Sequence, residues 1–304
     1  MNHPDRESDE SYSKLKTSVV IVTYNRNKDC KEAVLSVLRQ RKPPFEVIVV
    51  DDASLIPFQF EAPSVKIIRN ETERGLAASR NIGVHLSTGD IIAFIDDDDA
   101  LATPNWNQKL QEAFTADIDI VGGPCKPLYL SSLPKWWDEK LFGILCGISY
   151  HGVVGCNFAV KKETFNKVGY FNERLGRIHG KLISNEETEF FERVKRAYGR
   201  IVFEKDLEVY HKVYPNRLTM SYLLRRVWYQ GITECIQYPV STHLRKTLGC
   251  FRLIVVYLIK MLINRKNMRY YLIKMVAQLG FIFGLFISRS FNNEDALLGK
   301  TKHH

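Results

Sequence analysis

Four consecutive carboxylates, Asp96 to Asp99, directly follow the apolar run IIAFI. Adjacent carboxylates repel one another strongly unless a cation lies among them. Because alternate residues of an extended chain point to the same side, Asp96 and Asp98 can approach one hard divalent metal such as Mn2+ or Mg2+. A metal held this way keeps positions open for phosphate oxygens. A solvated acidic turn would explain a lone acidic run, but a position directly after a buried strand favours a metal site.

These aspartates need a rigid framework, and the chain around them predicts one. Within residues 17–23, Val19 to Val22 form a short apolar, β-branched run without alternation, which is typical of a parallel strand covered by helices on both faces. Strands and helices then alternate, which predicts an α/β fold built on a doubly wound, mostly parallel sheet. The further strands are expected over 45–54, 64–70 and 90–99, and the helices over 27–40, 75–87 and 104–114, the last opened by Pro104.

Three of these strands end in polar clusters, at residues 23–26, 51–54 and 96–99. In doubly wound sheets, ligands bind outside the carboxyl ends of the strands. We therefore expect the three clusters to face one crevice.

The second half of the predicted domain is less regular. From about residue 125, glycines, prolines and the pair Trp136-Trp137 indicate loops that shape a substrate site. A helix is expected from Asn185, as N-cap, to a stop at Gly199. Two short strands should follow and end at His211.

Seven segments in this order resemble the inverting family 2 glycosyltransferases of the GT-A fold. The resemblance covers about residues 17 to 215. The matching segments are VVIVTYNR, VVDDAS, RGLAASRNIG, FIDDDD as the metal-binding DxD motif, GCNFAVKKETFNKVGYFNE, NEETEFFERV and VYH.

The resemblance implies a set of residues that bind the nucleotide sugar. Asp52, or Asp51, would accept a hydrogen bond from the base, since a carboxylate suits an imide N–H. Arg80 would lie near the diphosphate, where a guanidinium pairs with phosphate oxygens. The remaining members of this set are Thr23, Tyr24, Asn25, Arg26 and Asp97.

The resemblance also implies the metal ligands and the catalytic base. Asp96 and Asp98 would hold Mn2+ or Mg2+, with His211 completing the shell or contacting the diphosphate. Pro104 lies further from Asp96 than is usual in the family, so Asp97 and Asp99 remain an alternative metal pair.

An inverting transfer needs a carboxylate that removes the proton of the acceptor hydroxyl. The family's Glu-Asp pair is Glu186-Glu187 in this chain, which makes Glu187 the expected base and Glu186 its substitute. Both are expected at a helix N-terminus, where the helix dipole alone would favour an acidic residue. Asn157, Trp136 and Trp137 would shape the acceptor side.

The net charge of +9 is unevenly distributed. Residues 1–216 contain 29 basic and 31 acidic side chains, whereas residues 217–304 contain 14 and 3. The basic residues of this tail interrupt long apolar runs, which favours an anionic membrane surface over a nucleic acid as partner. Lys260 and Lys274 lie near the middle of two such runs, so helices lying in the membrane plane are favoured over a spanning hairpin, and a soluble core or oligomer interface is the third alternative.

Other enzyme classes lack their motifs here. There is no GxGxxG of a Rossmann dehydrogenase, no GxxxxGK of a P-loop enzyme and no QxxRW of a processive polysaccharide synthase. The six cysteines form no CxxC pair and no zinc-like spacing with histidine, so reduced thiols are expected. A catalytically silent scaffold that docks on a membrane is the alternative function, but it would be expected to lack the DxD carboxylates or the base.

The sequence thus predicts a disordered tail over 1–16, a GT-A glycosyltransferase domain over 17–215 and a basic, apolar helical region over 216–304. The predicted activity transfers one sugar from a nucleotide-diphosphate donor, UDP- or dTDP-linked, with inversion. The acceptor would be a glycan or lipid-linked glycan in cell-surface polysaccharide synthesis. The enzyme would work at the cytoplasmic face of the membrane, peripheral or monotopic, without nucleic acid.

Overall fold

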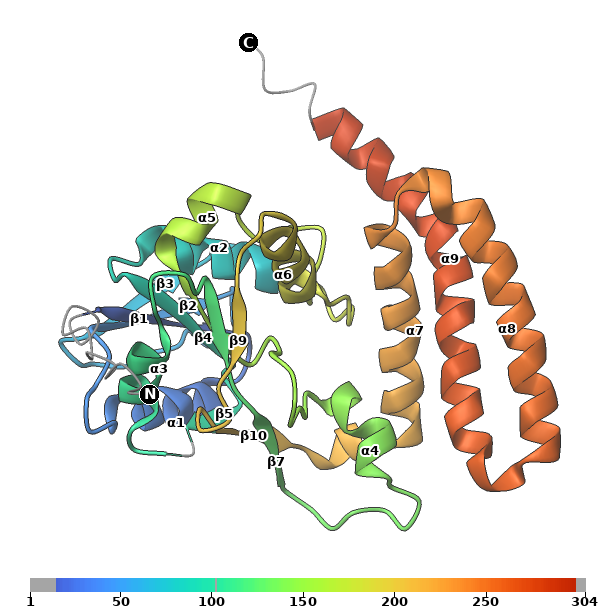
Figure 1. Ribbon diagram of the computed structural model, residues 1–304, viewed down its shortest axis with the longest axis horizontal. Helices are drawn as coiled ribbons and strands as arrows, with labels where there is room; N and C mark the ends of the chain where they lie inside the picture. Colours follow the sequence, from blue (N-terminus) through green and yellow to red (C-terminus); the bar gives the residue numbers. More distant parts are fainter. Residues whose placement is uncertain (1–14, 102, 299–304) are drawn as a thin grey trace, which may run out of the picture. The chain divides into compact units, whose positions relative to one another are not determined.

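A computed structural model describes residues 15–101 and 103–298 of the chain, so most of the expected tail over 1–16 lies outside the described residues (Figure 1). The chain divides into two compact units. The first comprises Met1–Leu130, Gly147–Arg174 and Glu186–Val213, and the second comprises Ser131–Cys146, Leu175–Asn185 and Tyr214–His304. The segments 131–146 and 175–185, which the sequence places in the predicted catalytic domain, are thus grouped with the C-terminal helices.

The first unit is built on a seven-stranded sheet of order β3-β2-β1-β4-β8-β6-β9. Strands β3, β2, β1 and β4 are mutually parallel, β8 is antiparallel to β4 and β6, and β9 is parallel to β6. The predicted mostly parallel α/β sheet is therefore confirmed. The strands are β1 (Thr17–Thr23), β2 (Glu46–Asp51), β3 (Val65–Arg69), β4 (Ile91–Ile95), β6 (Ile120–Gly122), β8 (Asn157–Lys161) and β9 (Ile201–Phe203).

Helices cover both faces of this sheet, which explains the unbroken apolar runs. Val19 and Ile21 of β1 pack with α1 (Asn27–Leu38) and α3 (Trp106–Ala113). Val20 points to the other face, where α2 (Leu76–Leu86), α5 (Lys162–Val168) and α6 (Glu186–Arg196) contribute to the core. Figure 1 shows α1 and α2 on opposite sides of the strands. Both faces of each central strand are therefore buried.

A second, three-stranded sheet of order β5-β10-β7 belongs to the same unit. Its strands are β5 (Asp99–Leu101), β7 (Cys125–Tyr129) and β10 (Val209–Val213). His211 pairs with Asp99 in the antiparallel ladder and with Pro127 in the parallel one. The predicted strand end at His211 is wrong, because β10 continues to Val213, and β5 was not expected within the acidic run.

Two predicted helix boundaries also differ. Helix α3 begins at Trp106 with Asn105 as N-cap, two residues after Pro104. Helix α6 ends at Arg196, and the residue in the left-handed conformation after it is Tyr198, with φ of 59°, rather than Gly199. The Gly199 amide nevertheless donates to the Val194 carbonyl at 2.9 Å.

The second unit contains three long helices that lie side by side, α7 (Met220–Gln237), α8 (His243–Ile263) and α9 (Met268–Leu298) (Figure 1). Helices α7 and α9 approach closely at two glycines. A Cβ on Gly231 would lie 2.0 Å from the Ala277 carbonyl oxygen, and one on Gly280 would lie 2.2 Å from that of Trp228. The same unit contains the short helices α4 (Glu139–Phe142) and η2 (Gly143–Cys146).

Among the described residues, one helical stretch, Arg265–Ile287, is long and apolar enough to cross a membrane, with a mean hydropathy of 1.7. The sequence suggested two equivalent apolar runs. Length and composition do not by themselves distinguish such a helix from one that packs within a protein.

Candidate active site

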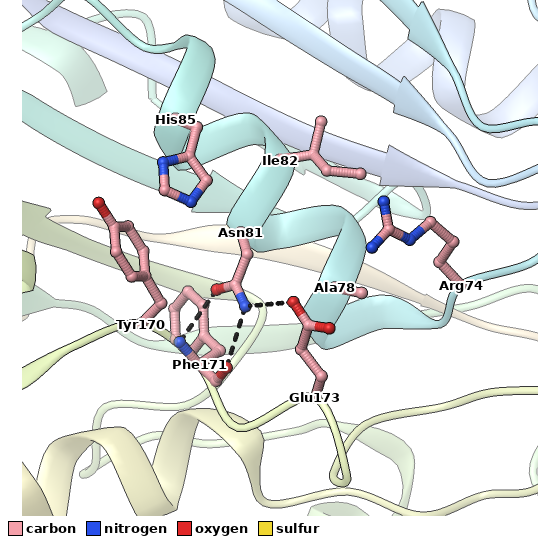
Figure 2. Close-up of a pocket in the computed structure, with 8 residues that line it drawn as sticks. All are labelled: Arg74, Ala78, Asn81, Ile82, His85, Tyr170, Phe171 and Glu173. Carbon is pink, nitrogen blue, oxygen red and sulfur yellow. Dashed lines mark hydrogen bonds between the residues drawn. The ribbon is translucent and has the colours of Figure 1, made fainter. Parts of the chain in front are cut away.

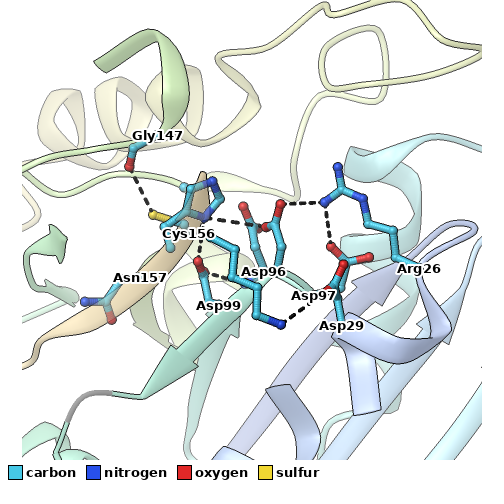
Figure 3. Close-up of polar contacts among 12 residues, drawn as sticks. Arg26, Asp29, Asp96, Asp97, Asp99, Gly147, Cys156 and Asn157 are labelled. Carbon is cyan, nitrogen blue, oxygen red and sulfur yellow. Dashed lines mark hydrogen bonds and ion pairs between the residues drawn. The ribbon is translucent and has the colours of Figure 1, made fainter. Parts of the chain in front are cut away.

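The acidic turn after β4 is tied to the end of β1. Thr23 Oγ1 donates to Asp97 Oδ2 at 2.9 Å. Arg26 Nη1 contacts Asp98 Oδ2 at 2.6 Å and Asp97 Oδ1 at 3.2 Å (Figure 3). The first and third polar clusters therefore meet at one edge of the sheet, as their positions at the carboxyl ends of neighbouring parallel strands predict.

The second cluster joins them through Asn25. The Asn25 amide donates to Ser54 Oγ at 2.8 Å, and its side-chain oxygen accepts from the Leu55 amide at 2.7 Å. Asn25 has a φ of 56°, a left-handed conformation that asparagine tolerates better than most residues. Tyr24 beside it is 42% exposed, and the nearby Glu73 charge raises the pKa of its hydroxyl.

Asp51 and Asp52 are both buried and both accept several hydrogen bonds. Asp51 accepts from the Ser54 and Phe58 amides and from Arg69. Asp52 accepts from Asn70 Nδ2 at 2.7 Å and from the backbone amides of Arg74 and Gly75, both at 2.8 Å. Asp52 thus holds the loop that leads into α2, in addition to the base contact expected for it.

His211 lies against the acidic turn. Its Nδ1 is 2.6 Å from Asp99 Oδ1 and 3.5 Å from Asp98 Oδ1. One ligand atom from each of Asp96, Asp98 and His211 lies within 4.8 Å of the others. The three residues named from the sequence as metal ligands are therefore brought together.

The electrostatics of this turn fit a divalent cation. Burial, together with the neighbouring negative charges, raises the pKa of Asp97 to about 7 and that of Asp99 well above its ordinary value. The side chains present thus compensate the carboxylate charges only in part. A set of two carboxylates and one imidazole suits Mn2+ or Mg2+, which prefer oxygen-rich shells.

Arg80 links the acidic turn to α6. Its guanidinium donates to Asp96 Oδ1 at 3.0 Å, to Glu186 Oε1 at 2.8 Å and to the Gly155 carbonyl at 2.7 Å. The side chain is 3% exposed and lies over the rings of Phe94 and Phe158, at 5.8 and 5.7 Å. The role of Arg80 at the diphosphate stays a prediction, and in this structure its guanidinium donates three hydrogen bonds to protein oxygens.

The two glutamates at the start of α6 differ. Glu186 is buried and paired with Arg80. Burial and the Glu186 charge raise the pKa of Glu187 to about 7. A Cβ on Gly155 would lie 3.0 Å from Glu187 Cδ, so the glycine leaves the space that the Glu187 carboxylate occupies. A carboxylate with a pKa near neutral pH suits a general base.

The residues expected on the acceptor side belong to two different units. Asn157 is buried at the start of β8, where its amide donates to the carbonyls of Leu207 and Pro124 and accepts from Trp106 Nε1. In this structure Asn157 therefore anchors β8 and does not line an open surface. Trp136 and Trp137 belong to the second unit, where each ring centroid is 5.8 Å from that of Phe142.

A hollow of about 490 Å³ lies along α2, against the segment that follows α5 (Figure 2). Asn81 links the two segments that line it. Its side chain accepts from the Phe171 amide at 2.9 Å and donates to the Phe171 carbonyl and Glu173 Oε1, both at 3.0 Å. None of the residues that line it belongs to the acidic turn or to α6, but Arg74, which lines it, donates its amide to Asp52 of the candidate active site.

A mostly parallel sheet with a cluster of possible metal ligands after β4 is typical of the GT-A glycosyltransferases. A sequence profile described as Glycosyl transferase family 2 matches residues 18–207. The chain belongs to this family and is a glycosyltransferase.

Similar proteins agree with this assignment. The glucosyl-dolichyl phosphate glucuronosyltransferase of Haloferax volcanii is 28% identical over 251 residues, which cover 75% of this chain and 80% of that protein. An uncharacterised glycosyltransferase of Haemophilus influenzae is 38% identical over 52% of this chain and 57% of its own length. Among solved structures, the Pyrobaculum calidifontis mannosyltransferase PcManGT, in complex with GDP-Man and Mn2+, has a TM-score of 0.54 at 15% identity, covering 95% of this chain and 81% of that one. At that identity the likeness shows the fold.

Three contacts in this region were not predicted from the sequence. Gly155 abuts Glu187, Asp99 pairs with His211, and Cys125 Sγ lies within 4.8 Å of possible ligand atoms of both Asp99 and His211. Cys125 and His211 are far apart in sequence, so their spacing gave no sign of a shared site. Only the pairing of β7 with β10 brings them together.

Proposed function

We propose that this glycosyltransferase transfers one sugar, with inversion, from a nucleotide-diphosphate donor to a glycan or lipid-linked glycan. The observation that supports this most directly is the bridge made by Arg80. Its guanidinium binds Asp96, a proposed metal ligand, and Glu186, the neighbour of the proposed base. The groups proposed to act on the leaving group and on the acceptor therefore lie close to one side chain.

Glu187 is the proposed base. With a pKa of about 7, it is substantially ionised at neutral pH and still basic enough to accept the acceptor hydroxyl proton. Arg80 holds Glu186 in place. The Glu186 charge raises the pKa of Glu187 and so makes Glu187 a better base. No covalent intermediate is required for inversion.

Asp96, Asp98 and His211 are the proposed ligands of Mn2+ or Mg2+. Such an ion, when bound, neutralises the charge that develops on the departing diphosphate. Arg26, about one-third exposed, positions Asp97 and Asp98 and is a partly exposed cation that could pair with phosphate oxygens. Thr23, Tyr24, Asn25, Asp97 and Asp51 or Asp52 complete the proposed pocket for UDP or dTDP.

A lipid-linked acceptor is supported by the name of the Haloferax relative, a glucosyl-dolichyl phosphate glucuronosyltransferase. A role in assembling cell-surface polysaccharide agrees with another relative, the succinoglycan biosynthesis protein ExoM, which is 28% identical over 52% of this chain. We assign catalysis to residues 17–215 and membrane association to residues 216–304.

Membrane association is supported by helix α8. Leu244, Leu248, Phe251, Val255, Leu258 and Leu262 are exposed, and their spacing of three and four residues places them on one stripe of the helix. Residues 238–290 contain basic side chains and no Asp or Glu. An apolar stripe on a basic helix suits the surface of an anionic membrane, here the cytoplasmic face.

Deletion of residues 245–304 should move the enzyme from the membrane to the soluble fraction. An intact protein that is already soluble at low salt would contradict this.

The activity is tested by screening nucleotide sugars for release of free nucleotide, with and without Mn2+ or Mg2+. Asp98→Ala should abolish metal-dependent turnover. Glu187→Gln should still bind the donor, as measured by calorimetry, while losing transfer. NMR of the product gives the anomeric configuration, and retention in place of inversion, or transfer by either variant, would overturn the assignment.

A further inference from the structure

Two buried thiols lie behind the acidic turn. Cys125 begins β7 and Cys156 immediately precedes β8. The two side chains hydrogen-bond to each other, and Cys156 Sγ also lies 3.7 Å from the Gly147 carbonyl oxygen (Figure 3). This pair has no part in the proposed transfer.

The small sheet places one of these thiols beside His211. In the parallel β10–β7 ladder, Val209 is opposite Cys125 and His211 is opposite Pro127. Cys125 and His211 are therefore diagonal neighbours, whose side chains lie on the same face. On the other side of β10, His211 is directly opposite Asp99. Three strands thus direct an oxygen, a nitrogen and a sulfur toward one point.

These donors are close enough to share an ion. One ligand atom from each of Asp99, Cys125 and His211 lies within 4.8 Å of the others, and all three residues are buried. This set differs in chemistry from Asp96, Asp98 and His211. A thiolate with an imidazole and a carboxylate suits Zn2+, whereas Mn2+ and Mg2+ favour oxygen ligands. His211 belongs to both sets.

We propose that Asp99, Cys125 and His211 form a second metal site, selective for Zn2+, and that its occupation inhibits transfer by withdrawing His211 from the Asp96–Asp98 site. Cys156 is adjacent and hydrogen-bonds to Cys125. As the sulfur–zinc bond forms, the Cys125 thiol releases its proton to solvent, and no change of oxidation state occurs. The inhibitory part rests on the proposed function, whereas binding of zinc does not.

Binding is tested on the full-length protein without nucleotide, with Co2+ as an optical probe. We expect a thiolate-to-cobalt charge-transfer band in the near ultraviolet, which Zn2+ displaces. Cys125→Ser should bind cobalt at least about tenfold more weakly, since it loses a ligand. Cys250→Ser, in the second unit, is the control and should leave the band unchanged. Asp96→Asn, which alters only the oxygen-rich set, should also keep it.

A band that is missing from the wild-type protein, or equally strong in Cys125→Ser, overturns the site. Zinc-edge X-ray absorption of the wild-type protein does not depend on how the variants fold. It should show a sulfur neighbour at about 2.3 Å, and a shell of nitrogen and oxygen alone overturns the proposal.

Inhibition is tested by nucleotide release at saturating Mn2+ with added Zn2+. The wild-type enzyme should be inhibited, and Cys125→Ser should need about tenfold more zinc for the same inhibition. Equal inhibition of both proteins overturns the regulatory role even where the cobalt band establishes the site. If no protein transfers sugar, the proposed function fails, while the optical and X-ray measurements still decide on the zinc site.

Discussion

Arg80 donates a hydrogen bond to Glu186 at 2.8 Å across 106 residues of sequence. Both side chains of this pair are buried, and the same guanidinium donates to Asp96. A buried cation between two carboxylates orients both, because its planar fork fixes the direction of each hydrogen bond. The geometry of the proposed metal ligand and of the proposed base is therefore coupled through one side chain.

Replacement of Arg80 should lower the stability of the fold. Arg80→Met leaves Glu186 and Asp96 as uncompensated buried or half-buried charges, which should lower the free energy of unfolding by about 3–5 kcal/mol. Urea unfolding measures this loss. In the double variant Arg80→Met/Glu186→Gln, the loss should be smaller than the sum of the two single losses. Strict additivity would show that the pair does not interact in solution.

The activity should depend on the protonation of Glu187. The base must be deprotonated, so kcat/KM should fall about tenfold per pH unit as the pH drops below the Glu187 pKa of about 7. Glu186→Gln removes a negative neighbour that raises this pKa, so the acidic limb should move to lower pH. A limb that stays in place would assign the titration to another group. The measurement is a pH profile of nucleotide release.

The same pKa predicts a pH-dependent effect on stability. A carboxylate whose pKa is raised on folding favours the folded state at low pH, and this contribution is lost as the pH rises through about 7. Glu187→Gln cannot ionise. Its Tm should therefore exceed that of the wild type at pH 8 by more than it does at pH 5. An equal difference at both pH values would mean that the pKa of Glu187 is not raised.

Gly155 provides a way to displace the base without unfolding the protein. In Gly155→Ala, the new Cβ would lie 3.0 Å from Glu187 Cδ. The carboxylate end is flexible and should move aside, so the free energy of unfolding should change by about 1 kcal/mol or less. Transfer should fall about tenfold or more, because small misplacements of a catalytic group are costly.

Gly152→Ala is the matched control for this substitution. A Cβ at Gly152 meets only Ser149 Oγ, at 3.7 Å, which is an ordinary contact. This variant should keep wild-type turnover and donor affinity. Equal activity of the two alanine variants would argue against Glu187 as the base.

The sequence predicted the central sheet and the meeting of its polar strand ends because both follow from local pattern. The unbroken apolar run Val19 to Val22 indicates a strand buried on both faces, and the carboxyl ends of parallel strands lie at the same edge of a sheet. The small sheet was not predicted, since β5 is only three residues long and begins within the acidic run. Its pairing of Asp99 with His211 spans 112 residues. The distinction between Glu186 and Glu187 likewise depends on Arg80, whose partners no local pattern specifies.

The stripe on α8 should determine membrane affinity. Leu248 is 63% exposed and lies on this stripe, whereas Leu253 is 39% exposed and lies on the opposite side of the helix. Leu248→Asp and Leu253→Asp both add one negative charge, so the long-range attraction to an anionic membrane decreases equally in the two variants. Only Leu248→Asp also removes an apolar side chain from the proposed contact, which is worth about 1.5–3 kcal/mol for leucine. In flotation with vesicles containing phosphatidylserine, Leu248→Asp should therefore bind at least about tenfold more weakly than Leu253→Asp.

If the two variants bind alike, charge alone accounts for the attraction and α8 does not insert its apolar stripe. Vesicles of neutral lipid complete the test, because the basic side chains of residues 238–290 predict that both variants and the wild type bind those vesicles more weakly.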